Sequence, residues 1–365
     1  MAVREFTAEG ALHLFSGLPS ALCPAHIFQA IDDEQLRAQL VGCNLYLVTC
    51  RRRILVDPRS IDLSGDTITG HLCVAREGWV ALPFRFRLSF EHHLGHPESL
   101  EVMVSTGGTH VAVQRGGATI FIASHVIIAQ AECDLTAEER DLHVLYVGQG
   151  VGRTRAKLAI DRLSNHATLQ RILADMHTYH PDTEVLLLLY RFDQSRTIVS
   201  TGGDMNLEVA AGTNEDGLHL KRLCDARIDR RARISLAEAA LINYFQPPYN
   251  VMFRKTNFAT QRKLRLLREV LSHDLTGLIV EICSHTLRAR LRSEAHPPVE
   301  LDSVIVEGYR HLAEESGELA EQARQELEQM LHTHNANFPL TRADERDTFL
   351  HGTCWFGTDE RQSFL

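Results

Sequence analysis

The sequence contains none of the short motifs that mark several large enzyme classes. Its 365 residues include no Walker A loop, no Gly-x-Gly-x-x-Gly dinucleotide fingerprint and no His-Glu-x-x-His zinc motif. Each of these motifs places particular groups around a phosphate or a metal ion. Their absence argues against an NTPase, a Rossmann-type oxidoreductase and a zinc metalloprotease.

Long apolar runs and paired cysteines are also absent. The longest apolar runs, such as Val185–Tyr190, fall far short of the roughly 20 residues that span a bilayer. The sequence opens with MAVREFTAEG, whose two glutamates do not fit a signal peptide. The eight cysteines are dispersed without a Cys-x-x-Cys pair, which favours buried thiols in a reducing compartment over a disulfide framework or a zinc site. We therefore expect a cytoplasmic protein without a membrane partner.

What the sequence does have is a basic middle between acidic flanks. The net charge is −6 for residues 1–150, +7 for residues 151–293 and −10 for residues 294–365. Hydrophobic residues make up 44% and charged residues 23%, as in ordinary soluble proteins. A localised positive region is typical of a phosphate-binding surface, although arginines that merely solvate helix faces would give the same asymmetry.

Residues 1–130 have mostly β character. Short runs of β-branched and aromatic residues are separated by turn signals such as Ser64-Gly65-Asp66. Strands are predicted at Leu45–Val56, Thr67–Val74, Val80–Phe90, Leu100–Ser105, His110–Gln114 and Ala118–Gln130. We expect a β-rich accessory or recognition domain, built as a small sandwich or barrel.

The pattern changes after an acidic connector at residues 131–142. A strand at His143–Val147, a helix at Ala167–Tyr179, an apolar strand at Glu184–Phe192 and a helix at Ile234–Phe245 predict an α/β domain over residues 141–253. Residues 193–233 interrupt it as a polar insertion. The remaining residues, 254–365, predict an α-rich region, with a basic helix at Gln261–Leu271, strands at Gly277–Ile282 and Thr286–Leu291, and an acidic helix at Val306–His332. The fold class expected for the whole chain is α+β.

Short motifs in this domain stand in a recognisable order. Leu145-Tyr146-Val147-Gly148-Gln149 is followed by Arg162 and His166, then by Glu238 in an apolar helix, then by Gln246-Pro247-Pro248-Tyr249-Asn250. This order resembles the GIY-YIG nuclease superfamily over residues 141–253. The resemblance implies a GIY-YIG-like nuclease domain and a metal-dependent endonuclease that hydrolyses DNA, with RNA left open and with defence against foreign DNA as the expected role.

The resemblance also implies roles for individual residues. Tyr146, Arg162, His166 and Glu238 would be catalytic, and Glu238 would hold Mg²⁺ or Mn²⁺. Together with the basic charge nearby, it predicts nucleic-acid contacts by Gly148, Gln149, Arg153, Arg155, Lys157, Asn250, Arg254, Lys255, Arg262 and Lys263.

The physical chemistry of these side chains supports the roles that the resemblance implies. Arg162 and His166 are four residues apart, which on one helix would place both side chains on the same face. A guanidinium binds phosphate oxygens in pairs, and a histidine can position or deprotonate water. A carboxylate among small apolar residues, as at Glu238, is costly to bury unless a cation or partner compensates it.

One expected residue is missing from this pattern. The first tyrosine of the motif should lie on the strand before the connector, and Ala118–Gln130 contains no tyrosine. This leaves open a catalytically inactive nucleic-acid-binding or assembly protein.

The acidic helix at Val306–His332 carries an apolar stripe and many glutamates. One hypothesis is that its acidic face competes with phosphate for the basic surface of the same chain. Permanent packing and a contact between two copies of the chain remain the alternatives.

Overall fold

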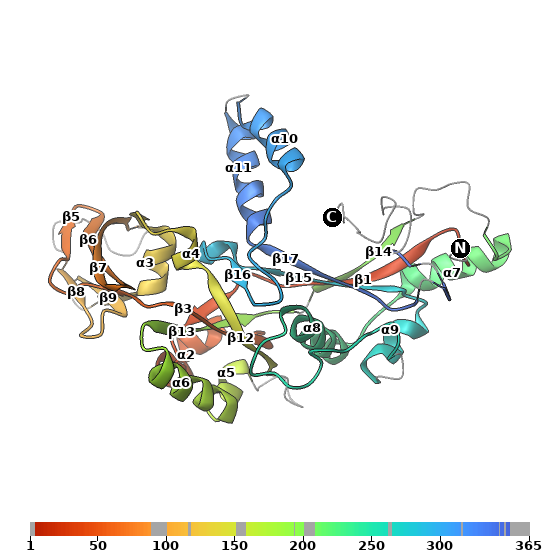
Figure 1. Cartoon of the computed structure of the whole chain (residues 1–365), viewed down its shortest axis with the longest axis horizontal. Helices are drawn as coiled ribbons and strands as arrows, with labels where there is room; N and C mark the ends of the chain where they lie inside the picture. The colour runs from red at the N-terminus through yellow and green to blue at the C-terminus, as the bar shows by residue number, and fades with distance from the viewer. Residues whose placement is uncertain are drawn as a thin grey trace.

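The computed structural model describes residues 4–88, 101–115, 118–150, 158–192, 194–200, 209–261, 265–314, 317–342, 344–346 and 348–350. The fold is α+β, as the sequence predicts. Figure 1 shows an elongated molecule, with a small β-rich unit at one end and larger mixed sheets across the middle and the other end.

The central sheet has the strand order β16-β12-β3-β13-β2. These strands are Leu291–Arg292, Leu142–Gln149, Leu45–Arg52, Thr183–Tyr190 and Ser20–Leu22, in that order. β3 is antiparallel to both of its long neighbours, β12 and β13. The apolar residues of β13 are buried on both faces of the sheet, which explains its unbroken run of leucines.

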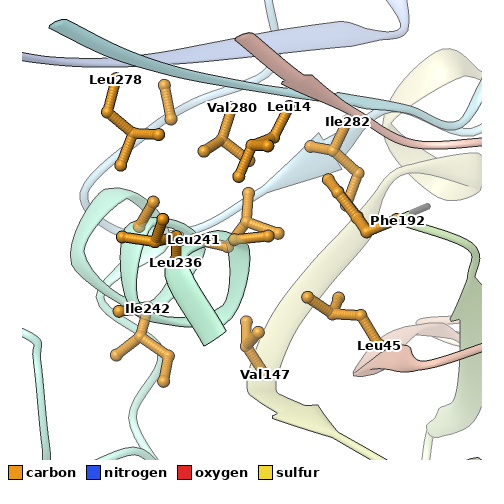
Figure 2. Close-up of a cluster of buried hydrophobic side chains, with 14 of the residues drawn as sticks. Leu14, Leu45, Val147, Phe192, Leu236, Leu241, Ile242, Leu278, Val280 and Ile282 are labelled. Carbon is orange, nitrogen blue, oxygen red and sulfur yellow. The ribbon is translucent and has the colours of Figure 1, made fainter. Parts of the chain in front are cut away.

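A second sheet has the order β14-β1-β15-β17. Its strands are Gln194–Ser200, Glu9–Phe15, Gly277–Cys283 and Thr333–Pro339. Helix α8 (Arg230–Phe245) lies between the two sheets, and its buried residues belong to one core with both. In Figure 2, Leu241 of α8 lies between Val280 of β15 and Val147 of β12. This position explains why the helix is apolar on nearly every side.

The other face of the central sheet is covered by shorter helices. They are α1 (His26–Asp32), α2 (Glu34–Gln39), α5 (Ala159–Leu163) and α6 (Ala167–Tyr179). Helix α6 confirms its predicted bounds. It buries Leu169, Ile172 and Met176, whose spacing of three and four residues forms one apolar stripe.

The β-rich unit, called the β unit below, occupies the chain between β3 and β12, with its own core. Its elements are β4 (Ile54–Val56), β5 (Asp62–Ser64), β6 (Thr67–Arg76), β7 (Gly78–Arg87), β8 (Glu101–Val104), β9 (His110–Arg115), β10 (Ala118–Ala123), α3 (Ser124–Gln130), β11 (Glu132–Cys133) and α4 (Ala137–Arg140). The central sheet therefore crosses the boundary predicted at residues 131–142. The β unit is an insertion into that sheet and not a separate N-terminal domain, because β3 precedes it and β12 follows it.

The strand predicted at Ala118–Gln130 needs a correction, because only its first half is β10 and the rest is α3. A short apolar run without clear periodicity suits a buried helix as well as a strand. The polar insertion predicted at residues 193–233 also contains regular structure. It supplies β14, which pairs antiparallel with β1, and helix α7 (Thr213–Asp225).

The C-terminal region differs from the prediction in three places. The basic helix is reduced to η2 (Arg265–Leu267) and α9 (Arg268–Ser272) within the described residues. Of the strand predicted at Thr286–Leu291, only Leu291 lies in a strand, β16, and the segment begins in the 3-10 turn η3 (His285–Leu287). The strand β17 was not predicted.

The acidic helix is a hairpin of α10 (Ser303–Glu314) and α11 (Glu318–Leu331). Gly317 begins α11 with φ +92°, a left-handed conformation that suits glycine and breaks the predicted single helix. Figure 1 shows the hairpin projecting from the body, away from α7 and α9. The hypothesis that it covers the basic surface of its own chain is therefore not supported. Within the described residues, no helix has the length and apolar character needed to cross a membrane.

Candidate active site

Two tyrosines lie side by side on the central sheet. In the antiparallel pair of β3 and β12, Gly148 is directly opposite Tyr46, and an irregularity in the register falls between Val144 and Tyr146. The rings of Tyr46 and Tyr146 stack with centroids 6.2 Å apart. A Cβ atom on Gly148 would come within 2.6 Å of the Tyr46 hydroxyl and 2.7 Å of the Tyr146 ring. Only glycine leaves room for both rings at this position.

Tyr46 is the residue that sequence reasoning missed. The first tyrosine was expected on Ala118–Gln130, whereas the strand that pairs with β12 is β3. The signal was present in the apolar strand Leu45–Arg52, which contains a tyrosine. The inserted β unit separates this strand from Tyr146 in the sequence, so proximity along the chain pointed to the wrong strand.

Arg162 and His166 do not share one helix, contrary to the prediction. Helix α5 ends at Leu163, and His166 is the N-cap residue of α6. The chain turns between them, with the His166 N–H donating to the Leu163 carbonyl. Both side chains still reach the tyrosines: the His166 ring lies 6.0 Å from that of Tyr46 and 5.2 Å from that of Tyr146.

The position of Arg162 is fixed by its neighbour on the short helix. Asp161 accepts two hydrogen bonds from Arg37 of α2, at 2.9 and 3.1 Å, and one from the Leu158 N–H at 2.8 Å. These contacts hold α5 against α2, while Arg162 itself is exposed. An exposed guanidinium beside two phenols can take a phosphate as its partner.

Glu238 approaches the site from α8. Its Oε2 accepts a hydrogen bond of 2.7 Å from Nε2 of Gln149, the last residue of β12. The Gln149 Oε1 atom in turn accepts from the Ser235 hydroxyl at 3.4 Å. This chain of contacts orients both the amide and the carboxylate.

Burial shifts the proton affinities of these groups. It raises the pKa of Glu238 to about 7, although Arg162 and the Gln149 hydrogen bond act in the opposite direction. Burial likewise raises the pKa of Tyr146 and of Tyr46, so both phenols are neutral near pH 7. Burial, followed by the positive charge of Arg162, lowers the pKa of His166, which is therefore neutral as well.

Two polar atoms at the site are buried without a hydrogen-bond partner of good geometry among the described residues: the Tyr46 hydroxyl and His166 Nδ1. The Arg162 guanidinium is near enough to lower the pKa of the Tyr46 phenol. Buried polar atoms are nearly always paired in folded proteins. Unpaired ones that face a cluster of other polar groups are consistent with a site that receives a ligand or water.

Asn250 joins the last predicted motif to the strand of Tyr146. Its Oδ1 accepts from the Val147 N–H and its Nδ2 donates to the Val147 carbonyl, both at 2.9 Å. The side chain thus completes the edge of β12 between Tyr146 and Gly148. Both ends of the buried Asn250 amide are thus paired with the strand, and the predicted nucleic-acid contact by Asn250 stays a prediction.

A metal ion would depend on one carboxylate here. No group of three or more His, Cys, Asp or Glu side chains within the described part of the chain could hold a metal. A hard divalent cation can instead be bound by a single carboxylate, waters and the substrate phosphate. Glu238 fits that role, since a nearby cation would favour the ionised form that burial disfavours.

The predicted basic contacts are only partly described. Arg254 is half-buried and Lys255 is exposed, in the segment that follows Asn250. The other predicted contacts, Arg153, Arg155, Lys157, Arg262 and Lys263, lie outside the described residues.

A cavity of about 1000 Å³ lies elsewhere, between α1–α2 and the β unit. No protein-family model, curated protein or solved structure matches this chain. The interpretation of the site therefore depends on its geometry and chemistry.

Proposed function

We propose that this protein is a metal-dependent nuclease that hydrolyses phosphodiester bonds of DNA, and that it is a divergent relative of the GIY-YIG nucleases. The observation that carries the proposal is the convergence of Tyr46, Tyr146, Arg162, His166 and Glu238 from separate elements. A cluster with only a structural role would not need an exposed arginine and a buried carboxylate, with its pKa raised, around two phenols.

Arg162 would bind the phosphate whose ester bond breaks. Hydrolysis builds negative charge on the phosphate oxygens, and a guanidinium can donate two parallel hydrogen bonds to them. The paired Asp161 and Arg37 hold the backbone of α5 in place, so that this arginine does not have to be ordered at the moment of reaction.

The attacking water would lie among His166 and the two tyrosines. Because His166 is neutral, its ring can accept the proton that water loses. The neutral phenols of Tyr46 and Tyr146 can orient this water or the phosphate by hydrogen bonds, but their raised pKa values disfavour a role as phenolate base. Of Tyr146 and His166, we favour His166 as the general base.

Glu238 would be the protein ligand of Mg²⁺ or Mn²⁺. Such an ion, when bound, supplies positive charge next to the leaving oxygen. Gln149 orients the carboxylate through its hydrogen bond to Oε2. The missing tyrosine that favoured an inactive binding protein now has a candidate in Tyr46, so we place catalysis first.

The test is cleavage of plasmid DNA, linear duplex DNA and RNA by the full chain, with Mg²⁺, Mn²⁺ or EDTA. We expect cleavage of DNA that needs a divalent ion and is lost in Glu238→Gln. DNA binding without cleavage under every metal condition would favour the inactive alternative. Cleavage that persists in both EDTA and Glu238→Gln would refute the assigned site.

A further inference from the structure

Two large apolar side chains stand in solvent on the loop that follows Asn250. Val251 is 92% exposed and Met252 is 70% exposed, and they directly follow the buried Asn250. Among the described residues, Val251 is the most exposed large apolar side chain. A single exposed apolar residue is common in soluble proteins, but an adjacent pair at these exposures next to a polar site calls for a contact partner.

The loop that carries this pair is anchored at both ends. Asn250 is bonded to the backbone of Val147, as described above. On the other side, Nδ2 of Asn243 donates to the carbonyls of Phe253, Arg254 and Thr256, at 3.0, 3.4 and 2.9 Å. The exposed pair is therefore held on a fixed loop and does not lie on a free end.

The backbone of this loop is strained at one residue. Phe253 has φ +67°, a left-handed conformation that is an outlier for a bulky side chain. Strain of this kind persists only where the surrounding contacts enforce it, and it concentrates at functional sites. Here the Asn243 amide supplies those contacts.

Both anchors belong to elements of the site. Asn250 is bonded between Tyr146 and Gly148 on β12, and Asn243 is on α8, the helix of Glu238. The loop also continues into Arg254, whose Nε is buried without a partner among the described residues, and into the exposed Lys255. A loop that presents apolar side chains beside positively charged ones could bind a polyanion that also has apolar surfaces.

We propose that Val251 and Met252 form a wedge that inserts against the stacked bases of duplex DNA while its phosphate is bound at Arg162; this inference rests on the nuclease function proposed above. The sugar–phosphate backbone of a duplex offers apolar side chains little to pack against. Extensive apolar contact comes from the faces of the bases, which such side chains reach by partly unstacking a base step in the groove. Arg254 and Lys255 would bind the flanking phosphates.

The wedge is tested with full-length protein carrying Glu238→Gln, which prevents cleavage. The probe is duplex DNA with 2-aminopurine, a base whose fluorescence rises on unstacking. Val251→Ser with Met252→Ser is the wedge variant, and Val304→Ser with Ile305→Ser on the distant hairpin is the control, since Val304 and Ile305 are 74% and 43% exposed. We expect a fluorescence rise with the parent and the control, and its loss with the wedge variant.

The rates of cleavage of duplex and single-stranded DNA give a second readout. In the active background, the wedge variant should cleave duplex DNA at least about tenfold more slowly at limiting protein, a difference of about 1.4 kcal/mol, while cleaving single-stranded DNA like the parent. Equal fluorescence and equal duplex cleavage would overturn the wedge and leave the nuclease proposal intact. A parent that cleaves nothing would overturn both.

A contact between proteins is the competing explanation. If the wedge variant behaves as the parent on DNA but changes the molecular mass measured by light scattering, the pair mediates self-association and the proposal is overturned. The exposure of both side chains predicts an unchanged melting temperature, so loss of folding is not expected to obscure the result.

Discussion

Gly148 lies directly opposite Tyr46 across β3 and β12, and an added Cβ would come within 2.6 Å of the Tyr46 hydroxyl. A larger residue here must push the two tyrosine rings apart. We expect Gly148→Ala to lower the free energy of unfolding by about 1–3 kcal/mol, as overpacking does, and to abolish cleavage. Gly217 in α7, where a Cβ would meet nothing within 4 Å, provides the control. Urea denaturation of both variants makes the comparison; equal stability of Gly148→Ala and Gly217→Ala would contradict the tight packing.

Removing the Tyr46 hydroxyl should separate function from stability. Among the described residues this buried hydroxyl has no well-placed partner, so Tyr46→Phe should leave the protein as stable as before or slightly more stable. If the hydroxyl orients water or phosphate, cleavage should fall at least about tenfold. Tyr190→Phe is the matched control, because its hydroxyl on β13 is also buried without a partner in the described part of the chain. Similar activity of the two variants would place Tyr46 in the core only.

Glu238 should make the metal-free protein less stable as the pH rises. Its pKa in the folded protein is about 7, against 4.5 in an unfolded chain, so its contribution to stability is complete below pH 4.5 and is lost as the pH rises through 7. Glu238→Gln removes this loss and should be more stable than the parent above pH 7, by about 1–3 kcal/mol.

Thermal melts in EDTA between pH 5 and pH 8 measure this difference. Added Mg²⁺ should raise the melting temperature of the parent and leave that of Glu238→Gln unchanged, because an ion that binds only the folded state stabilises it. If the difference in melting temperature between Glu238→Gln and the parent does not grow with pH, Glu238 is not desolvated in the folded protein.

Replacing Arg162 with lysine should damage catalysis. An ammonium cannot reproduce the two parallel hydrogen bonds of a guanidinium, and we expect the single-turnover rate to fall about a hundredfold or more. Arg171→Lys on α6 is the control, since its side chain is 75% exposed, lies 3.7 Å from Asp175 and packs over the Tyr249 ring. An Arg162→Lys enzyme within a few-fold of the Arg171→Lys enzyme would exclude the proposed phosphate contact.

Asn250 should matter for stability as well as activity. Asn250→Asp keeps an acceptor for the Val147 N–H but places a carboxylate against the Val147 carbonyl in a buried position. We expect a loss of about 2–4 kcal/mol, because an unpaired buried charge costs more than a neutral group. Chemical denaturation measures the loss. A variant with parental stability would mean that the pairing seen here contributes little.

Much of the local structure followed from patterns within the sequence. The period of buried residues predicted α6, and the unbroken apolar runs predicted β13 and α8. These patterns are local, because burial of one face or of all faces leaves a signature over a few turns of helix or one strand. The strand predictions at residues 118–130 and 286–291 were wrong in part for the same reason. The apolar runs there are too short to distinguish a strand from a helix or a turn.

The sequence by itself determined the chemistry available to this protein: a tyrosine, an arginine, a histidine and a carboxylate, in an order that resembles the motifs of one nuclease family. Only the tertiary structure brought Tyr46 to Tyr146, across an inserted β unit with its own core. It also placed α8 between two sheets, and this burial raises the pKa of Glu238 to about 7. The physical reason is that strand pairing and desolvation depend on residues distant in the chain, and no local pattern records which distant segments will exclude water together.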